Sequence, residues 1–182
     1  MKKFPLTLLL LTIIFSSIAQ NYKPADEGSK VHFVIKNFGI NTGGDIKGLN
    51  GSIQFDPANL KTANFNVSVD VKTIDTDNGT RDEHLRSDSY FDAEKYPVIT
   101  IKSTKINKTN KSTAGWYYFT GTLTMHGVTK TILFPFSATV KGDSYLFEGK
   151  FELDRLAYGV GQNSSVMGKV VKVSLSVLAK KS

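Results

Sequence analysis

The residues of this sequence that could do chemistry begin with its three histidines, His32, His84 and His126. Histidine titrates near neutral pH and is the commonest metal ligand among the side chains. No two of these histidines have the i, i+4 spacing that places a pair of zinc ligands on one helix face. The chain has no cysteine, so it offers neither thiolate ligands nor a cysteine nucleophile. The sequence therefore predicts no metal site and no cofactor.

A charged stretch around His84 is the strongest candidate for catalysis. Asp82 and Asp88 lie within four residues of His84, and a carboxylate beside a histidine is the arrangement of a hydrolase-type acid–base pair. The same acids are explained more simply as the solvated first turn of a short helix, where carboxylates complement the helix dipole. The sequence also lacks the G-x-S-x-G motif of serine hydrolases. We therefore expect no catalytic residue, and keep a hydrolase that uses His84 with Asp82 or Asp88 as an alternative.

The segment that holds these residues, 76–101, is the one stretch that does not read as a β-strand. Thr80 and Glu83 have the T-x-x-E spacing of a capping box, which predicts a short helix beginning at Arg81. Pro97 then forces the preceding residue into an extended conformation and leads into an apolar run. The segment is predicted to be a helical cap between two strands.

Most of the remaining chain alternates between apolar and polar residues, as half-buried strands do. Gly43 and Gly44 are predicted to turn the chain, and residues 21–28 are predicted to be a polar lead. Gly48 lies at a break in the alternation, which indicates a bulge or bend. Pro135 lacks a ladder donor, so its strand is predicted to be irregular or at an edge there. The pattern predicts about eight strands, over residues 31–36, 49–55, 65–71, 98–106, 116–125, 129–140, 145–153 and 171–177.

Eight amphipathic strands with no long helix to cover them favour closure into an antiparallel all-β barrel, which hides the apolar face and removes the sheet edges. A barrel of this size either fills with side chains or holds one small ligand. Each buried methylene contributes about 0.8 kcal/mol, so an apolar chain could bind without an ion pair. The residues predicted to line such a pocket are Phe33, Ile35, Phe55, Val69, Leu85, Phe91, Tyr96, Ile99, Ile101, Phe119, Leu123, Phe134 and Phe136.

Residues 1–19 have the form of a cleaved secretory signal peptide. Lys2 and Lys3 precede an apolar run from Phe4 to Phe15, and the small residues of Ser17-Ile18-Ala19 then predict cleavage after Ala19. The run is shorter than the ~20 residues that span a bilayer, so we expect no membrane anchor. Residues 20–182 are predicted to form a single domain that is periplasmic or secreted.

The charge distribution argues against nucleic-acid binding. The formal net charge is +7, and removing Lys2 and Lys3 with the leader leaves +5. The remaining lysines are scattered singly except for Lys180-Lys181 at the tail, whereas nucleic-acid binders concentrate basic residues on one face. The sequence leaves a monomer and a homodimer both open.

Four motifs in this chain resemble the YceI-like family. They are I-D-T-D-N at 74–78, R-D-x-H-L-R-S at 81–87, Y-F-D-A-x-K-Y-P at 90–97 and G-x-L-T-x-H-G-V-T-K at 121–130. The resemblance implies an extended lipocalin-like barrel, exported to the periplasm, that binds a polyisoprenoid or related amphiphilic lipid without enzyme activity or a metal. It implies that the segments at 81–85 and 90–97 lie at the barrel mouth. The candidates there for contact with a lipid head group are Arg81, His84 and Asp88.

The main hypothesis from the sequence is therefore non-enzymatic binding, transport or storage of a polyprenyl lipid or isoprenoid quinone. Beside the hydrolase alternative, a scaffold for an envelope protein partner stays open. A scaffold would need a sizeable exposed apolar patch, whereas the alternation puts mostly lysine, asparagine, serine and threonine outside.

Overall fold

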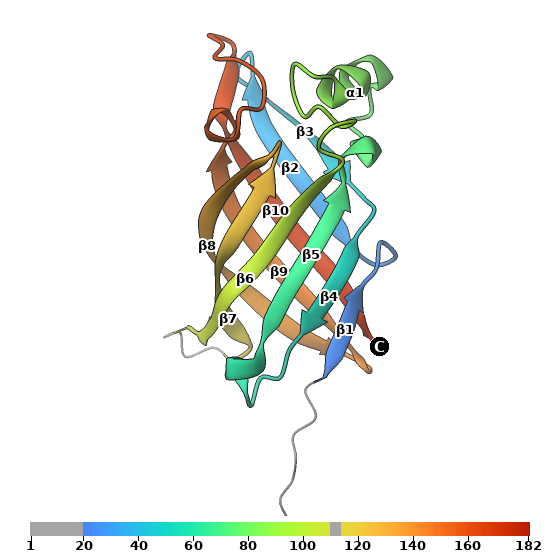
Figure 1. Cartoon of the computed structure of the whole chain (residues 1–182), viewed down its shortest axis with the longest axis vertical. Helices are drawn as coiled ribbons and strands as arrows, with labels where there is room; N and C mark the ends of the chain where they lie inside the picture. The colour runs from blue at the N-terminus through green and yellow to red at the C-terminus, as the bar shows by residue number, and fades with distance from the viewer. Residues whose placement is uncertain (1–19, 110–113) are drawn as a thin grey trace, which may run out of the picture.

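The computed structural model describes residues 20–109 and 114–182, so the predicted leader lies outside it. Within this part, ten strands form one antiparallel sheet in the order β1-β4-β5-β6-β7-β8-β9-β10-β2-β3, and β1 also pairs with β10 (Figure 1). The strands are β1 Asn21–Pro24, β2 Lys30–Asn37, β3 Ile40–Ile46, β4 Asn50–Gln54, β5 Asn64–Asp70, β6 Val98–Lys108, β7 Trp116–Met125, β8 Val128–Lys141, β9 Ser144–Asp154 and β10 Met167–Lys181.

The pairing of β1 with β10 closes the sheet into a barrel, and the ring contains β1 and β4 to β10. The predicted eight-stranded antiparallel barrel is confirmed. The hairpin of β2 and β3 continues the wall beyond this ring, because β2 pairs with the first half of β10 and β1 with its last residues. A bridge between Asp45 and Asp75 joins β3 to the segment after β5.

The prediction of a polar lead over residues 21–28 was wrong, because this segment contains β1. Tyr22 is buried and pairs with Ile53 of β4 and Lys181 of β10, so it belongs to the strand that closes the barrel. The strand is four residues long and ends at Pro24. A period of two cannot be read over so short a run.

The prediction of a turn at Gly43-Gly44 was also wrong, because both glycines lie inside β3. A Cβ on Gly43 would lie 2.5 Å from the Phe33 carbonyl oxygen, and one on Gly44 would lie 2.5 Å from the Asp75 oxygen. These glycines therefore allow a close approach of backbones rather than a turn. The break in the alternation at Gly48 corresponds to the end of one strand and the start of the next: its φ is +75° and it lies between β3 and β4.

Pro135 lies where the sheet opens, as expected of a residue without an N–H donor. It pairs with Tyr118 of β7, but the pairing of β8 with β9 begins only at Phe136 and Gly149. The first half of β8 therefore has a partner strand on one side only, which confirms the predicted edge position.

The α-helix is α1, Gly79–Arg86, and it begins two residues before the predicted start. Asn78 is its N-cap, and the Asn78 side chain accepts a hydrogen bond from the Arg81 amide at 3.0 Å. The predicted capping box of Thr80 and Glu83 is therefore not used, because asparagine is itself a preferred N-cap. The described residues also contain three short 3-10 helices: η1 Leu60–Thr62, η2 Val71–Thr73 and η3 Arg155–Tyr158.

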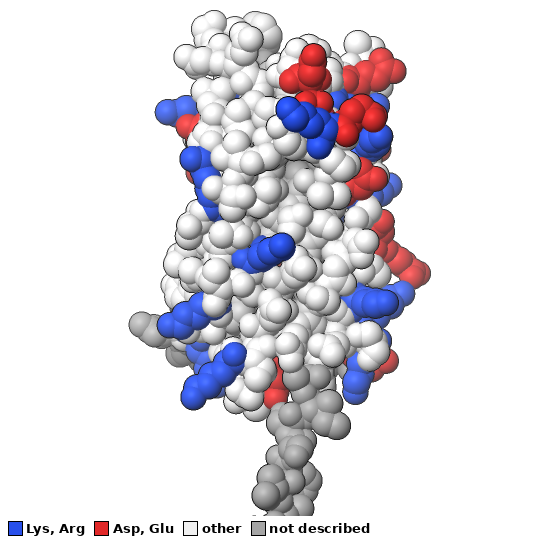
Figure 2. Space-filling view, viewed as in Figure 1, with Lys and Arg blue, Asp and Glu red and all other residues white. Residues whose placement is uncertain are grey.

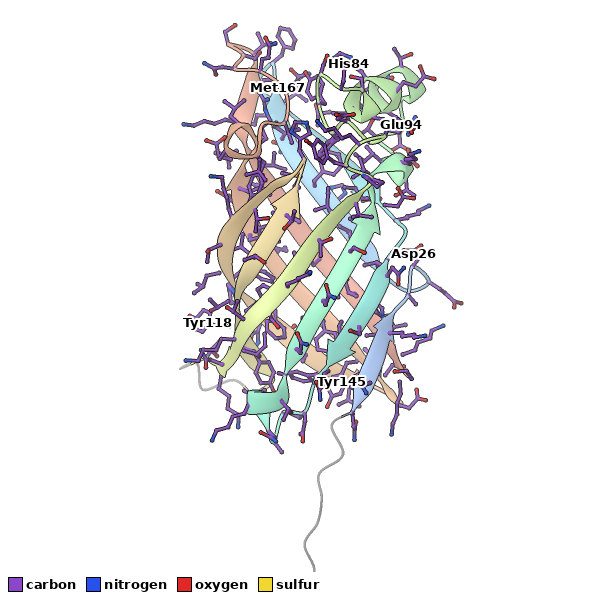
Figure 3. The ribbon with its side chains drawn as sticks, viewed as in Figure 1. Asp26, His84, Glu94, Tyr118, Tyr145 and Met167 are labelled. Atoms are coloured by element: carbon purple, nitrogen blue, oxygen red, sulfur yellow. The ribbon has the colours of Figure 1, made fainter. Side chains whose placement is uncertain are left out.

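Aromatic rings fill the lower half of the barrel, which is the end where Figure 3 labels Tyr145. We call this cluster the aromatic plug. Phe55 lies at its centre, with four rings at centroid distances of 5.2–6.0 Å. Higher up, Phe134 stacks between Phe119 and Phe151, at 4.9 Å from each. The plug consists of Tyr22, Phe55, Phe65, Tyr117, Phe119, Phe134, Phe136, Tyr145 and Phe147.

Candidate ligand-binding cavity

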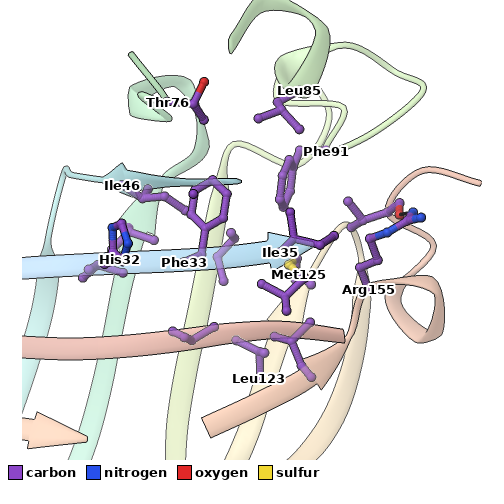
Figure 4. A pocket seen from close by; sticks show the side chains of 18 of the residues that line it. His32, Phe33, Ile35, Ile46, Thr76, Leu85, Phe91, Leu123, Met125 and Arg155 are labelled. Atoms are coloured by element: carbon purple, nitrogen blue, oxygen red, sulfur yellow. Dashed lines mark hydrogen bonds between the residues drawn. The ribbon is translucent and has the colours of Figure 1, made fainter. Parts of the chain in front are cut away.

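The upper half of the barrel, between the aromatic plug and α1, contains a cavity of about 210 Å³. Its lining is almost entirely apolar and comes from β2, β3, β5, β6, β7, β9 and β10 and from the segment around α1 (Figure 4). An apolar cavity of about 150 Å³ is large enough to bind benzene. This cavity can therefore hold a segment of an apolar chain.

Eight of the residues predicted to line a pocket lie around this cavity. Their strand members are spaced by two on β2 and β6, and Val69 of β5 and Leu123 of β7 have a cavity-lining residue two positions away, Val67 and Met125, so the alternation of side chains turns them inward. Leu85 and Phe91 approach from the cap toward Phe33 and Ile35 of β2 (Figure 4). The eight are Phe33, Ile35, Val69, Leu85, Phe91, Ile99, Ile101 and Leu123. Their contact with a ligand stays a prediction.

The aromatic plug forms the floor of the cavity. Phe119, Phe134 and Phe136, also predicted to line the pocket, surround a second cavity of only about 50 Å³ below it. Val67 and Ile101 line both cavities, so the two lie next to each other. The barrel is thus hollow in its upper half and filled in its lower half.

Phe55 and Tyr96 lie outside both cavities, unlike the expectation for them. Phe55 is enclosed by other rings of the plug. The Tyr96 ring packs on the ring of His126, with centroids 4.9 Å apart, and lies against Gly127. Tyr96 therefore ties the cap segment to the turn between β7 and β8, which periodicity along the sequence cannot reveal.

The charged residues of the cap hold it to the barrel. Asp82 is 7% exposed, and its Oδ1 accepts hydrogen bonds from the backbone N and the Oγ1 of Thr76. The Arg81 Nε donates to the same Thr76 Oγ1 at 2.8 Å. Arg86 Nη1 donates to the Ile74 carbonyl at 3.2 Å. These bonds fix α1 over the cavity.

The residues of the hydrolase alternative do not form an acid–base pair in this arrangement. His84 lines the cavity and its ring packs on Tyr90, with centroids 4.8 Å apart. Asp88 lies outside the cavity, and its carboxylate accepts from the Ser89 hydroxyl at 3.3 Å. Within residues 20–109 and 114–182, no hydrogen bond joins His84 to Asp82 or Asp88. Arg81 and His84 thus reach the cavity, and Asp88 does not.

Arg155 is a site residue that the sequence reasoning missed. It lines the cavity, is 4% exposed, and donates to three carbonyls, from Nε to Gly168 at 3.0 Å, from Nη1 to Val160 at 2.8 Å and from Nη2 to Gln162 at 2.8 Å. Its guanidinium therefore organises the loop between η3 and β10. A lone arginine before a loop rich in glycine and serine carries no signal of such a role.

His32 also lines the cavity, where it bonds to Asp45. Its Nδ1 lies 2.6 Å from the Asp45 Oδ1, and the Lys30 ammonium lies 3.3 Å from Oδ2. Burial raises the pKa of the Asp45 carboxyl, but the hydrogen bonds from His32 and Lys30 and their charges lower it by more, so its pKa lies below the ordinary value. This pair joins β2 to β3 at the cavity wall.

In the part of the chain that the structure describes, no group of three or more His, Asp or Glu side chains is placed to hold a metal ion. No helix of that part is long and apolar enough to cross a bilayer.

Two proteins are similar to this chain in sequence. Over 127 residues the chain is 36% identical to the UPF0312 protein plu2095 of Photorhabdus laumondii, spanning 68% of this chain and 64% of that protein. It is 33% identical to protein YceI of Escherichia coli O157:H7 over 149 residues, which are 79% of this chain and 76% of that protein.

Two solved structures show the same fold. The crystal structure of BcnA from Burkholderia cenocepacia has a TM-score of 0.79 at 25% identity, covering 86% of this chain and 99% of that one. A polyisoprenoid binding domain from Saccharophagus degradans, implicated in plant cell wall breakdown, has a TM-score of 0.70 at 14% identity, covering 91% and 100%. The sequence pattern of the YceI-like domain matches residues 22–179. This chain belongs to the YceI-like family.

Proposed function

We propose that this protein binds an amphiphilic isoprenoid lipid, a polyprenyl carrier or an isoprenoid quinone, and carries or stores it in the cell envelope. The observation that supports the proposal is the apolar cavity of about 210 Å³ between the cap and the aromatic plug. The fold shared with the polyisoprenoid binding domain of Saccharophagus degradans favours an isoprenoid over other apolar ligands.

The energetics of burial are sufficient for such a ligand. At about 0.8 kcal/mol per methylene-sized group, each five-carbon unit gains roughly 4 kcal/mol when it is fully buried. Association costs about 4–15 kcal/mol in lost freedom of motion, so two or more buried units are needed for useful affinity. The plug stops the chain at the floor, and the rest of a longer lipid leaves through the mouth.

Arg81 and His84 are the groups that we propose orient the lipid head group. Both reach the cavity from α1. Arg81 uses Nε and one Nη to bond to Thr76, and a guanidinium has five N–H donors in total. The remaining donors suit a phosphate or carbonyl oxygen of a head group.

The proposal is for binding without catalysis. The Asp82 carboxylate is engaged by Thr76, and Asp88 lies away from the cavity. A hydrolase would need His84 and one of these carboxylates to converge on a substrate in the cavity.

The proposal is tested by the lipid that accompanies the protein. The protein is purified under mild conditions from the periplasm of a Gram-negative host, extracted with organic solvent, and the extract is analysed by mass spectrometry. We expect about one prenyl lipid per chain. Val173→Phe, on β10 in the cavity lining, should lower the bound amount, because the larger ring occupies the ligand space.

Val140→Phe is the matched control, since Val140 is an exposed residue on β8 and the same enlargement there leaves the cavity unchanged. An extract without prenyl lipid from wild type, or equal lipid from wild type and Val173→Phe, would overturn the proposal.

The export of the protein is proposed from its leader and is tested separately. N-terminal sequencing of the protein from a periplasmic fraction should begin at Gln20. Recovery of the full chain from the cytoplasm, with Lys2 and Lys3 still present, would contradict export.

A further inference from the structure

Three apolar side chains project into solvent at the mouth of the barrel. Phe38 is 72% exposed and Ile40 is 70% exposed, and both lie at the tip of the hairpin of β2 and β3. Val166 is also exposed, and its carbonyl accepts a hydrogen bond from the Phe38 amide at 2.8 Å. We call Phe38, Ile40 and Val166 the rim patch.

The backbone at Phe38 makes its exposure unusual. Phe38 and Gly39 form a two-residue loop between the paired residues Asn37 and Ile40, and their φ angles are +51° and +77°. Two positive φ angles are the mark of a type I′ turn, whose first position is usually asparagine, aspartate or glycine. A bulky residue with positive φ is a strained outlier, and such outliers cluster at functional sites. The hairpin thus holds an exposed phenylalanine where asparagine would be easier to accommodate.

The two segments that carry the rim patch contain no charged residue, and a lysine flanks each of them. Residues 37–44 and 156–168 contain no Asp, Glu, Lys or Arg. On the side of the patch, the exposed Lys36 precedes the first segment and the exposed Lys169 follows the second. Figure 2 shows an uncharged surface where the loop before β10 lies, whereas charged side chains gather over α1. An apolar tip with basic flanks is the pattern of a surface that meets anionic lipid.

The rim patch borders the cavity. Asn37 and Met167 line the cavity, pair with each other, and are the chain neighbours of Phe38 and Val166. A prenyl chain leaving a bilayer through water exposes its whole apolar surface, at about 0.8 kcal/mol per methylene. Contact between the mouth and the bilayer avoids that exposure.

We propose that the rim patch docks the barrel mouth onto a bilayer that contains anionic phospholipid. Phe38, Ile40 and Val166 enter the boundary between head groups and acyl chains, and Lys36 and Lys169 lie at the phosphates. The role of this contact, transfer of the ligand between membrane and cavity, rests on the function proposed above, but the docking itself does not.

The test is co-sedimentation with vesicles of phosphatidylcholine and phosphatidylglycerol in equal parts. Wild type should bind, and Phe38→Asn should bind about tenfold more weakly or worse, because one buried phenylalanine is worth at least that factor. Asparagine is the preferred residue of this turn, so the variant should melt at the same temperature as wild type or higher. Loss of binding therefore cannot come from unfolding.

Two further variants identify what the patch recognises. Leu133→Asn removes a side chain that is 64% exposed on β8 and should leave vesicle binding unchanged. Lys36→Gln and Lys169→Gln should each weaken binding by about fivefold at low salt, and should have little effect on vesicles of phosphatidylcholine alone.

Equal vesicle binding by wild type and Phe38→Asn would overturn the proposal. A stable wild-type dimer would also overturn it if Phe38→Asn dissociated the dimer and vesicles did not dissociate it, because the patch would then be an interface between two copies. A protein that binds vesicles through the patch but carries no lipid in its cavity would support docking and refute the proposed function. A protein that carries lipid in its cavity but does not bind vesicles would support the proposed function and refute docking.

Discussion

Truncation of Phe134 distinguishes the filled half of the barrel from the hollow half. Phe134 is 4% exposed and stacks between Phe119 and Phe151, so Phe134→Ala removes a ring with neighbours on both faces. Removing a buried phenylalanine costs about 3–5 kcal/mol in unfolding free energy, from lost transfer energy and the cavity left behind. At about 2–4 °C per kcal/mol for a domain of this size, the melting temperature should fall by roughly 6–20 °C.

Two matched substitutions calibrate that loss in unfolding free energy. Phe33→Ala removes the same ring from the wall of the existing cavity, where one side of the ring already lacks neighbours, so it should cost less than Phe134→Ala. Phe38→Ala acts on an exposed side chain and should change stability by no more than about 0.5 kcal/mol. Urea and thermal unfolding of the lipid-free proteins give all three values.

The relative sizes of these losses in unfolding free energy test whether the lower half of the barrel is packed and the upper half is hollow. A cost below about 1 kcal/mol for Phe134→Ala would mean that the lower half is not packed, and the plug could not end the cavity. A cost for Phe33→Ala equal to that for Phe134→Ala would mean that the upper half is not hollow. Phe134→Ala should also join the small lower cavity to the upper one, so its bound lipids should shift toward longer chains.

Three other predictions concern the polar contacts around the cavity. Asp82→Ala leaves the buried Thr76 amide without its acceptor and should lower the unfolding free energy by about 1–3 kcal/mol, measured by urea unfolding; a change near zero would show that the cap does not depend on this carboxylate. Arg155→Met removes the donors to three carbonyls and should speed hydrogen exchange and proteolysis within residues 159–168 more than elsewhere; uniform loss of protection would contradict the local role. Asp45→Asn should destabilise the protein at neutral pH. The folded pKa of Asp45 is lowered, so the contribution of its carboxylate to stability is present above the ordinary pKa of 3.8 and is lost as the pH falls through the folded pKa. The difference in unfolding free energy between variant and wild type should therefore shrink in acid. A difference that grows in acid would contradict a lowered pKa of Asp45 in the folded protein.

Alternation of residue types was enough to predict the barrel and much of the cavity wall. Phe33 and Ile35, or Ile99 and Ile101, are two apart on long strands, so a period of two places both of each pair inside. The short β1 carries no readable period, and the glycines of β3 resemble turn residues until their partner backbones are known. The sequence pattern therefore did not reveal β1, the strand that closes the barrel, or the tip of the hairpin of β2 and β3.

The polar part of the site was harder to predict, because it depends on contacts between distant segments. Arg155 acts through carbonyls up to thirteen residues away, and His32 is paired with Asp45 on the next strand. Asp82 lies beside His84 in the sequence but bonds to Thr76 in the fold. Proximity along the chain thus suggested an acid–base pair where the structure has an anchored cap. Tyr96, assigned to the pocket from its place in the cap, packs on His126 instead.

The division of the barrel into a hollow mouth half and a packed lower half is most directly tested by where a bound lipid lies. Isotope-filtered nuclear Overhauser measurements between an unlabelled prenyl lipid and labelled protein methyl groups give that position. We predict contacts from the lipid chain to Ile35, Leu123 and Val173, which line the upper cavity, and none to Ile53, which lies at the level of the plug. Contacts to the exposed Leu133 and Val140 in place of the cavity residues would contradict a ligand held inside the barrel.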